Sequence, residues 1–239
     1  MIILGIDTAT DQVGVALGGV EGVLAEFRVA RGRRHAETLA PAVDFVCRQA
    51  GIELSDVSVV AVDVGPGLFT GLRVGLAAAK AIASALRTPM IGLPSLDLLA
   101  FPLRHTARTV VPVVDARRSE VFTTTYRTVP GGLQRLAPYR LCSPTDLLAE
   151  LQATDEEHVL AGDGALRYAE VFSGDSRIEL ATVGYAYPSA AALVELSQPR
   201  ALREDFVQPW EVQPLYLRRP DAEINWDRRH PSGLLARGT

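Results

Sequence analysis

Lysine is almost absent from this chain of 239 residues: Lys80 is the only one, and the other basic residues are arginines. Cysteine is also scarce, because Cys47 and Cys142 are the only two, and their separation fits neither a zinc motif nor a redox motif. A chain without a cysteine framework is typical of a reducing compartment. We therefore expect a cytoplasmic protein that is stabilised by its core rather than by disulfides.

Targeting and membrane-spanning signals are lacking as well. The apolar run at the N-terminus ends at Asp7 and has no basic region before it, unlike a signal peptide. The longest apolar region, residues 68–86, contains Arg73 and Lys80, which argues against a membrane span. The formal net charge of −4 excludes a chain that is basic throughout, such as a nucleic-acid coat protein. We expect a soluble protein with no membrane partner.

Catalytic and metal-binding patterns are thin. The four histidines, His35, His105, His158 and His230, are scattered, and none has a His or Cys three or four residues away. The sequence therefore shows no helical metal site, and a metalloprotease gains no support from it. Ser95 is better placed as a helix cap than as a nucleophile, since no base lies near it in sequence.

Apolar residues are abundant, at 48% of the chain, and predict a large buried core. The spacing of the apolar residues predicts three strands, a helix, a strand, a long helix, a short strand and a helix. A similar series of elements then follows in the second half of the chain. The expected elements are strands at 2–6, 13–17, 23–29, 57–64 and 90–92 with helices at 36–50, 70–86 and from 95, then strands at 110–115, 121–127, 133–141 and 158–161 with helices at 143–151, 165–172 and 189–197.

Two successive βββαβα patterns predict a duplicated ribonuclease-H-like α/β fold, the architecture of actin, Hsp70 and sugar kinases (ASKHA). We expect a first domain at residues 1–105, a smaller second domain at 106–198 and an extended tail at 199–239. Trp210, Leu215 and Tyr216 are the residues expected to dock the tail.

Two segments could contact a nucleotide in such a fold. The turn Asp7-Thr8-Ala9-Thr10 would offer a carboxylate and hydroxyls, although a turn held by its own side chains is the more ordinary explanation. The loop at residues 65–71 leads from strand to helix but is neither a Walker A loop nor G-x-G-x-x-G. The alternative function is thus a phosphotransferase or ATPase, with candidate phosphate contacts at Asp7, Thr8, Thr10, Gly67 and Asp115.

The helix at 70–86 is apolar on almost every side. Its long polar side chains, Arg73, Lys80 and Arg87, form one narrow stripe, whereas a helix between a sheet and water needs a much narrower apolar arc. Gly71, Gly75 and Ala79 recur at four-residue spacing, which lets another helix approach closely. Either the second domain covers this helix or a helical partner does.

Several segments together resemble the TsaB (YeaZ) family, in the family's order over most of the chain. The glycine loop and the following helix are the most diagnostic, with Leu68 in place of the usual serine. The segments are ILGIDTATDQVGVAL, RRHAETLAP, GPGLFTGLRVGLAAAKAIA, PMIGLPSLDLLA, VVDARRSEVF and PLYLRR.

The resemblance implies a subunit rather than an enzyme. Such proteins pair with a TsaD-like catalytic paralogue, which transfers threonylcarbamoyl to N6 of adenosine 37 in tRNAs that read ANN codons, and a TsaE-like ATPase joins them. In the paralogue two metal-ligand histidines occupy the positions of Ser95 and Leu99 here, and these side chains are unsuited to iron or zinc. We expect no cofactor of its own, with ATP and a metal ion in the partner subunits.

The resemblance also implies a partner surface on the first two helices, at residues 36–50 and 70–86. Replacing Gly75 by leucine is expected to abolish partner binding and leave the monomer folded. A homodimer is expected when the chain is alone, since an uncovered apolar helix pair is unfavourable in water. The candidate contacts are Leu39, Val43, Val46, Leu72, Gly75, Leu76 and Ala79, with His35 at the rim.

Two basic clusters could touch tRNA within the complex, although a solvated loop and a solvated tail explain each cluster taken alone. They are Arg31, Arg33 and Arg34 in one cluster, and Arg218, Arg219, Arg228 and Arg229 in the other.

Overall fold

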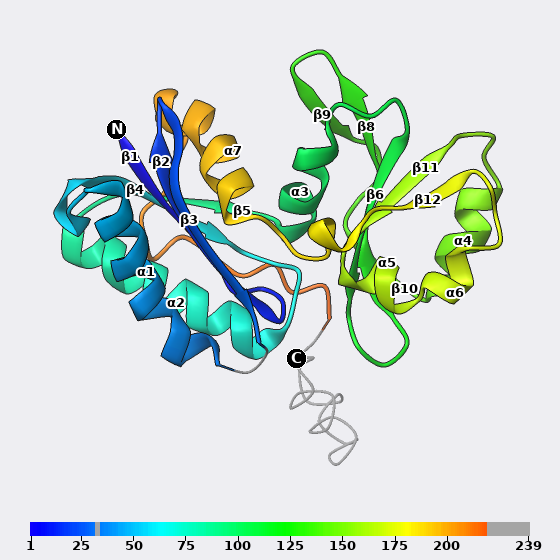
Figure 1. Cartoon of the computed structure of the whole chain (residues 1–239), viewed down its shortest axis with the longest axis horizontal. Helices are drawn as coiled ribbons and strands as arrows, with labels where there is room; N and C mark the ends of the chain where they lie inside the picture. The colour runs from blue at the N-terminus through cyan, green and yellow to red at the C-terminus, as the bar shows by residue number, and fades with distance from the viewer. Residues whose placement is uncertain (32–33, 219–239) are drawn as a thin grey trace, which may run out of the picture.

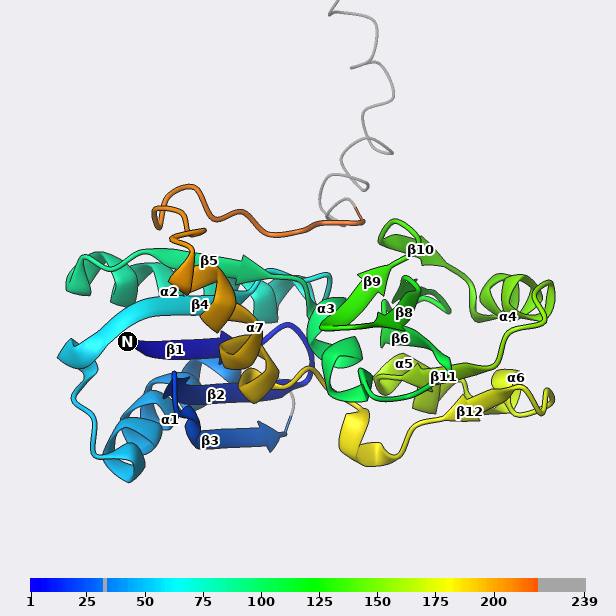
Figure 2. The ribbon, with the colours of Figure 1, turned by 90° about the horizontal axis from the view of Figure 1, so that it is seen from above.

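The computed structural model describes residues 1–31 and 34–218 and contains two mixed β-sheets with helices on their faces (Figures 1 and 2). In the first sheet the strand order is β3-β2-β1-β4-β5. The first three strands are antiparallel neighbours, and β4 and β5 run parallel to β1. The strands are β1 (Ile2–Asp7), β2 (Gln12–Gly19), β3 (Gly22–Ala30), β4 (Val57–Asp63) and β5 (Met90–Leu93).

The second sheet repeats this topology. Its central strand β6 pairs antiparallel with β7 and β8 and parallel with β11, and β12 follows β11. Its strands are β6 (Thr109–Asp115), β7 (Val121–Thr123), β8 (Tyr126–Val129), β9 (Gly132–Arg135), β10 (Arg140–Cys142), β11 (His158–Ala161) and β12 (Ile178–Leu180). If β7 with β8 and β9 with β10 each count as one strand, both sheets have the same order. The prediction of a duplicated ribonuclease-H-like fold is confirmed.

The second strand of this sheet, expected to be continuous, is interrupted opposite Pro112. Proline has no backbone N–H to donate to a neighbouring strand. The Thr123 hydroxyl donates instead to the Pro112 carbonyl, at 2.8 Å, and the Thr124 hydroxyl donates to Ala137 O at 2.6 Å. The strand therefore divides into β7 and β8.

Helices α1 (His35–Ala50) and α2 (Phe69–Leu86) lie side by side on one face of the first sheet, and α7 (Ala190–Leu202) lies on the other (Figure 1). Helix α3 (Ser95–Ala100) leads into the second domain, where the sheet is covered by shorter helices. These are α4 (Pro144–Gln152), α5 (Asp163–Arg167) and α6 (Ala169–Phe172), with 3₁₀ turns η1 (Leu54–Asp56), η2 (Phe101–Leu103) and η3 (Val183–Tyr185) elsewhere in the chain.

The position of α7 corrects the domain assignment made from sequence. We expected a helix at 189–197 within the second domain, but α7 belongs to the first domain by packing. Leu193 and Val194 of α7 are fully buried with Ile3 and Val59 of the first sheet. Gly5 permits this approach, since a Cβ there would lie 3.1 Å from the Ala190 carbonyl oxygen.

Residues 203–218, which we call the strap, run from α7 back across the first domain (Figure 2). Val207 exchanges two backbone hydrogen bonds with Met90 of the edge strand β5, at 2.8 and 2.9 Å, and Leu215 N donates to Val64 O at 2.7 Å. Val212 is buried in the first core, whereas Trp210 is 71% exposed. The expectation that Trp210 docks the tail is wrong, because Val207 and Val212 make those contacts.

Helix α2 also qualifies the expectation about membranes. By length and composition alone it could cross a bilayer, and it is the one such helix in the part of the chain that the structure describes. Its Arg73 and Lys80 therefore do not exclude a span by themselves. In the folded chain, however, α2 packs through Leu76, Ala79 and Ala83 onto the first sheet, as a core helix does.

Candidate functional site

The inner faces of α1 and α2 hold most of the residues that were expected to contact a partner. Leu39, Val43, Val46, Leu76 and Ala79 are buried in the first domain's own core. Leu72 and Gly75 are buried as well, and so is His35, whose Nε2 is 2.8 Å from Thr10 O. Most of these side chains face the sheet and belong to the core, although Leu39 and Val43 also line a hollow between the two helices.

Gly75 has a different role from the one expected. A Cβ at this position would lie 2.3 Å from the Thr8 hydroxyl oxygen, and one at Gly71 would lie 2.2 Å from the Thr8 carbonyl oxygen. The small residues thus let α2 approach the β1–β2 hairpin, not another helix. The expectation that Gly75→Leu leaves the monomer folded is wrong, because even a methyl group has no space there.

Between the two helices lies an apolar hollow of about 830 Å³, which we call the α1/α2 groove, and its lining includes Leu39 and Val43. Asp44, Arg48 and Glu53 lie at its rim. The sequence carried a signal for this surface in alanines spaced along both helices, but the larger apolar residues on the opposite faces obscured it. The groove is lined chiefly by Ala36, Ala40, Val74, Ala78, Ala81 and Ile82.

The β1–β2 hairpin, where a nucleotide phosphate was considered, is filled by the protein itself. The Thr8 hydroxyl donates to Gly71 O at 2.7 Å, and Leu68 N donates to Ala9 O at 2.7 Å. A Cβ at Gly67 would lie only 2.1 Å from Ala9 O. Asp7, Thr8 and Thr10 are buried beneath these contacts, so they are not open to a phosphate in this structure.

Two aspartates meet behind the hairpin, at the ends of the parallel strands β1 and β4. Asp7 and Asp63 are buried, and each accepts a backbone N–H from the loop that follows it, at 2.9 Å from Ala9 and 2.7 Å from Gly65. Asp7 Oδ2 and Asp63 Oδ2 have no hydrogen-bond donor, so burial of two charged carboxylates here is unfavourable and a proton on one of them relieves it.

Burial is the main cause of unusual pKa values in this pair. It raises the pKa of Asp7 well above its ordinary value, and the nearby Asp63 carboxylate adds to the effect. Burial also raises the pKa of Asp63, to about 6, although hydrogen bonds from Ser95 and Gly65 oppose the increase. The pair therefore favours a shared proton over two negative charges.

Helix α3 carries Ser95 and Leu99, the two positions at which the resemblance implies metal ligands in a catalytic paralogue. The Ser95 hydroxyl donates to Asp63 Oδ1 at 2.7 Å, and Leu99 packs with Val114 and Phe122 of the second domain. Within residues 1–31 and 34–218, no group of three or more His, Cys, Asp or Glu side chains is arranged to hold a metal ion. These side chains do not fit a metal site.

Helix α3 also ties the two domains together through Asp97. Its Oδ1 accepts hydrogen bonds from the hydroxyls of Tyr126 and Tyr139. Burial, reinforced by the Asp97 charge, raises the pKa of Tyr126 above its ordinary value, so this hydroxyl remains a donor. The contact is structural and lies on the second-domain side of the helix.

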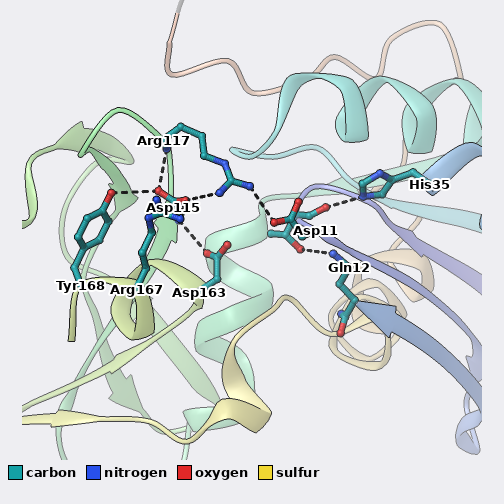
Figure 3. Close-up of polar contacts among 9 residues, drawn as sticks. Asp11, Gln12, His35, Asp115, Arg117, Asp163, Arg167 and Tyr168 are labelled. Carbon is teal, nitrogen blue, oxygen red and sulfur yellow. Dashed lines mark hydrogen bonds and ion pairs between the residues drawn. The ribbon is translucent and has the colours of Figure 1, made fainter. Parts of the chain in front are cut away.

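Asp115, a candidate phosphate contact, lies at the domain junction in an ion-pair network (Figure 3). Its Oδ2 is 2.9 Å from Arg117 Nη1, and Arg117 Nη2 is 2.9 Å from Asp11 of the first domain. Asp163 Oδ1 accepts the Asp115 backbone N–H at 2.9 Å, and burial raises the pKa of Asp163 to about 6. Arg117 thus bridges the two domains.

Some residues singled out in the sequence lie outside the described part of the chain. They are Arg33, Arg219, Arg228, Arg229 and His230.

Comparisons with known proteins agree on one family. Residues 22–226 match the family described as TsaD, tRNA N6-adenosine threonylcarbamoyltransferase. The tRNA threonylcarbamoyladenosine biosynthesis protein TsaB of Bacillus subtilis is 28% identical, over 95% of this chain and 98% of that protein. An uncharacterised Mycobacterium leprae protein is 37% identical over 93% of this chain, which spans only 56% of that protein's length. The structure of YeaZ from Pseudomonas aeruginosa superposes with a TM-score of 0.79 at 27% identity, covering 90% of this chain and 99% of that one.

Proposed function

Because this chain belongs to the TsaB (YeaZ) family of tRNA threonylcarbamoyladenosine biosynthesis proteins, we propose that it is a non-catalytic subunit that binds a TsaD-like catalytic paralogue. Its activity would be to hold that paralogue in the complex that modifies N6 of adenosine 37 in tRNAs reading ANN codons. A TsaE-like ATPase would join the same complex.

The observation that carries the proposal is the α1/α2 groove. The groove is a hollow of about 830 Å³ with an apolar floor, and an exposed apolar surface rimmed by polar residues is typical of a protein–protein interface. Alanines at its edges, such as Ala40, Ala78 and Ala81, let helices of a second chain approach closely. We propose that this groove, which includes Leu39 and Val43 of the residues named from sequence, receives the paralogue, and receives a second copy of this chain when the paralogue is absent.

Two further features support a scaffold over a phosphotransferase. The hairpin that would hold a phosphate is occupied by α2 and its preceding loop. The metal-ligand positions of the paralogue are taken by Ser95, which holds Asp63, and by Leu99, which packs between the domains. These residues serve the fold and leave the chemistry to the partner.

Light scattering with size-exclusion chromatography tests the proposal. The wild-type chain, mixed with its genome's TsaD-like paralogue at micromolar concentration, is expected to form a one-to-one complex that displaces any homodimer. Ala81→Arg places a long charged side chain on the exposed groove edge and is expected to weaken the complex by at least about tenfold, because that charge would be buried without a partner.

Ala149→Arg is the matched control, because Ala149 is exposed on α4 of the second domain. This variant should bind like wild type, and both variants should unfold at the wild-type temperature. A wild-type chain that ignores the paralogue would contradict the proposal. Equal binding by Ala81→Arg and Ala149→Arg would contradict the placement of the interface.

A further inference from the structure

Three hollows follow one another along the domain junction, where α1 and α2 begin. A shallow depression beside Arg31 and Arg34 shares Asp11 and His35 with a hollow of about 580 Å³ in front of α2. That hollow shares Phe69, Thr70 and Arg117 with a third, of about 340 Å³, which extends to the end of the strap. Neighbouring hollows share lining residues, so the three lie side by side along this junction.

Arginine dominates the walls of this surface. Five arginines line it, and we call them the arginine band: Arg31, Arg34, Arg117, Arg118 and Arg218.

The arginine band stands out against the charge of the whole chain. Among the described residues that line the three hollows, Asp11 is the one acid, and it is paired with Arg117 at 2.9 Å. Glu120, which lies outside the hollows, pairs with Arg218. Asp115, also outside the hollows, balances Arg117 as well, at 2.9 Å. Five arginines and one acid line the three hollows, whereas the chain as a whole has a formal net charge of −4. Such a local excess attracts polyanions.

The fold joins two clusters that are far apart in the sequence. Arg31 and Arg34 come before α1, whereas Arg218 ends the strap. Arg117 and Arg118, which come after β6, lie between them along the surface. The positive ends of the α1 and α2 dipoles border the same surface. Each cluster alone is typical of a solvated loop. In the fold, however, the five arginines lie one after another along the same surface.

Exposed aromatic rings lie along this path. Phe69 and Tyr216 are 38% and 39% exposed, and their ring centroids are 5.5 Å apart. The Arg73 guanidinium lies 3.8 Å from the centre of the Phe69 ring and Arg73 Nε donates to the Tyr216 hydroxyl at 3.4 Å. Aromatic rings and guanidinium planes beside cationic groups are the surfaces on which unpaired bases stack.

We propose that the arginine band and the adjoining Phe69–Tyr216 pair bind single-stranded RNA directly, with phosphates on the arginines and a base on the rings. The choice of RNA rests on the proposed function, which places this chain in a tRNA-modifying complex. The band adjoins the α1/α2 groove, since Ala36 and Val74 line both surfaces. An RNA held here would therefore lie next to a paralogue docked on that groove.

Fluorescence anisotropy with an unmodified tRNA transcript tests this proposal, using the full chain alone and in complex with the paralogue. Arg34→Gln combined with Arg118→Gln removes one cation from the part of the band before α1 and one from its middle. We expect binding to weaken by about fivefold for each arginine removed. We also expect the slope of log Kd against log salt to fall by about 0.7 for each lost phosphate contact.

The matched control is Arg127→Gln combined with Arg203→Gln, which removes the same charge at exposed positions outside the three hollows. This control should bind the transcript within about twofold of wild type, by the usual size of surface effects. A separate variant, Phe69→Leu, should weaken binding by about tenfold without changing the salt slope, because stacking releases no counterions.

Light scattering on the same samples reports paralogue binding independently. If the arginine-band variant loses RNA binding but still forms the complex with the paralogue, the proposed RNA site is supported. Equal RNA affinity for the band and control variants, or a wild-type chain that does not bind the transcript in either form, overturns it. Specific RNA binding without paralogue binding would overturn the proposed function and leave the band in place.

Discussion

Gly75 lies where α2 comes closest to the β1–β2 hairpin. A Cβ on this residue would lie 2.3 Å from the Thr8 hydroxyl oxygen, and this hydroxyl is already held by Gly71 O at 2.7 Å. A methyl group would therefore push apart a buried helix and a buried turn. The four-residue spacing of small residues was visible before the fold was known, but it does not indicate which side of an almost wholly apolar helix faces the sheet.

We predict that Gly75→Ala lowers the free energy of unfolding by about 1–3 kcal/mol, the usual cost of overpacking a core. Urea denaturation followed by circular dichroism measures the change. Gly174→Ala is the control, because a Cβ at Gly174 meets no atom within 4 Å. An equal effect at both positions would show that α2 does not press on the hairpin.

The Asp7–Asp63 pair makes stability depend on pH. Both carboxyl groups have a pKa in the folded chain that is raised above the ordinary value of 3.8, to about 6 for Asp63. The folded state therefore holds protons that the unfolded state has lost, and the free energy of unfolding falls as the pH rises from about 4 through the folded pKa values.

Asp7→Asn should remove much of this dependence. An asparagine amide can donate to Asp63 at every pH, so we expect the variant to be more stable than wild type by ~1–3 kcal/mol at pH 8 and similar to it near pH 4. Thermal unfolding between pH 4 and pH 8 measures both. Asp155→Asn, at a fully exposed side chain, should keep the wild-type pH profile. A profile for Asp7→Asn that parallels wild type would rule out the shared proton.

At the scale of elements, the strap is attached to the first domain by a few buried side chains and not by its largest side chain, Trp210. Val212 is 4% exposed within the first core, whereas Trp210 is 71% exposed. Aromatic size suggested an anchor at Trp210, but burial in an extended segment alternates with the backbone and cannot be read from residue size. The strap also covers the edge of β5 through the Val207–Met90 hydrogen bonds.

Val212→Ala is predicted to destabilise the chain by about 1–3 kcal/mol, because it leaves a cavity in the first core. Trp210→Ala should change stability by no more than ~0.5 kcal/mol, as surface substitutions usually do. Denaturant unfolding compares the two variants. The reverse order would mean that the strap docks through Trp210 after all.

At the scale of the whole molecule, the duplicated fold was predictable because the βββαβα pattern occurs twice with strong apolar periodicity. The path of the chain after the second sheet was not predictable from the sequence. Helix α7 follows β12 in sequence but packs through Leu193 on the first sheet, and no local pattern distinguishes one buried sheet face from another. Most residues predicted to contact a partner lie on the inner faces of α1 and α2, because both faces of α2 are apolar and the sequence does not distinguish them. The arginine band depends on segments separated by about 180 residues of chain, so only the fold brings it together.

The return of α7 and the strap to the first sheet has a consequence for synthesis on the ribosome. Domains generally fold as units from the N-terminus while the chain is being made. Here the first domain is begun by β1 but lacks α7 and the cover on β5 until the second domain has been translated. One face of its sheet and one edge strand therefore stay open during elongation. Until α7 and the strap leave the exit tunnel, a chaperone or the emerging second domain would have to cover this sheet face and edge strand of the nascent first domain.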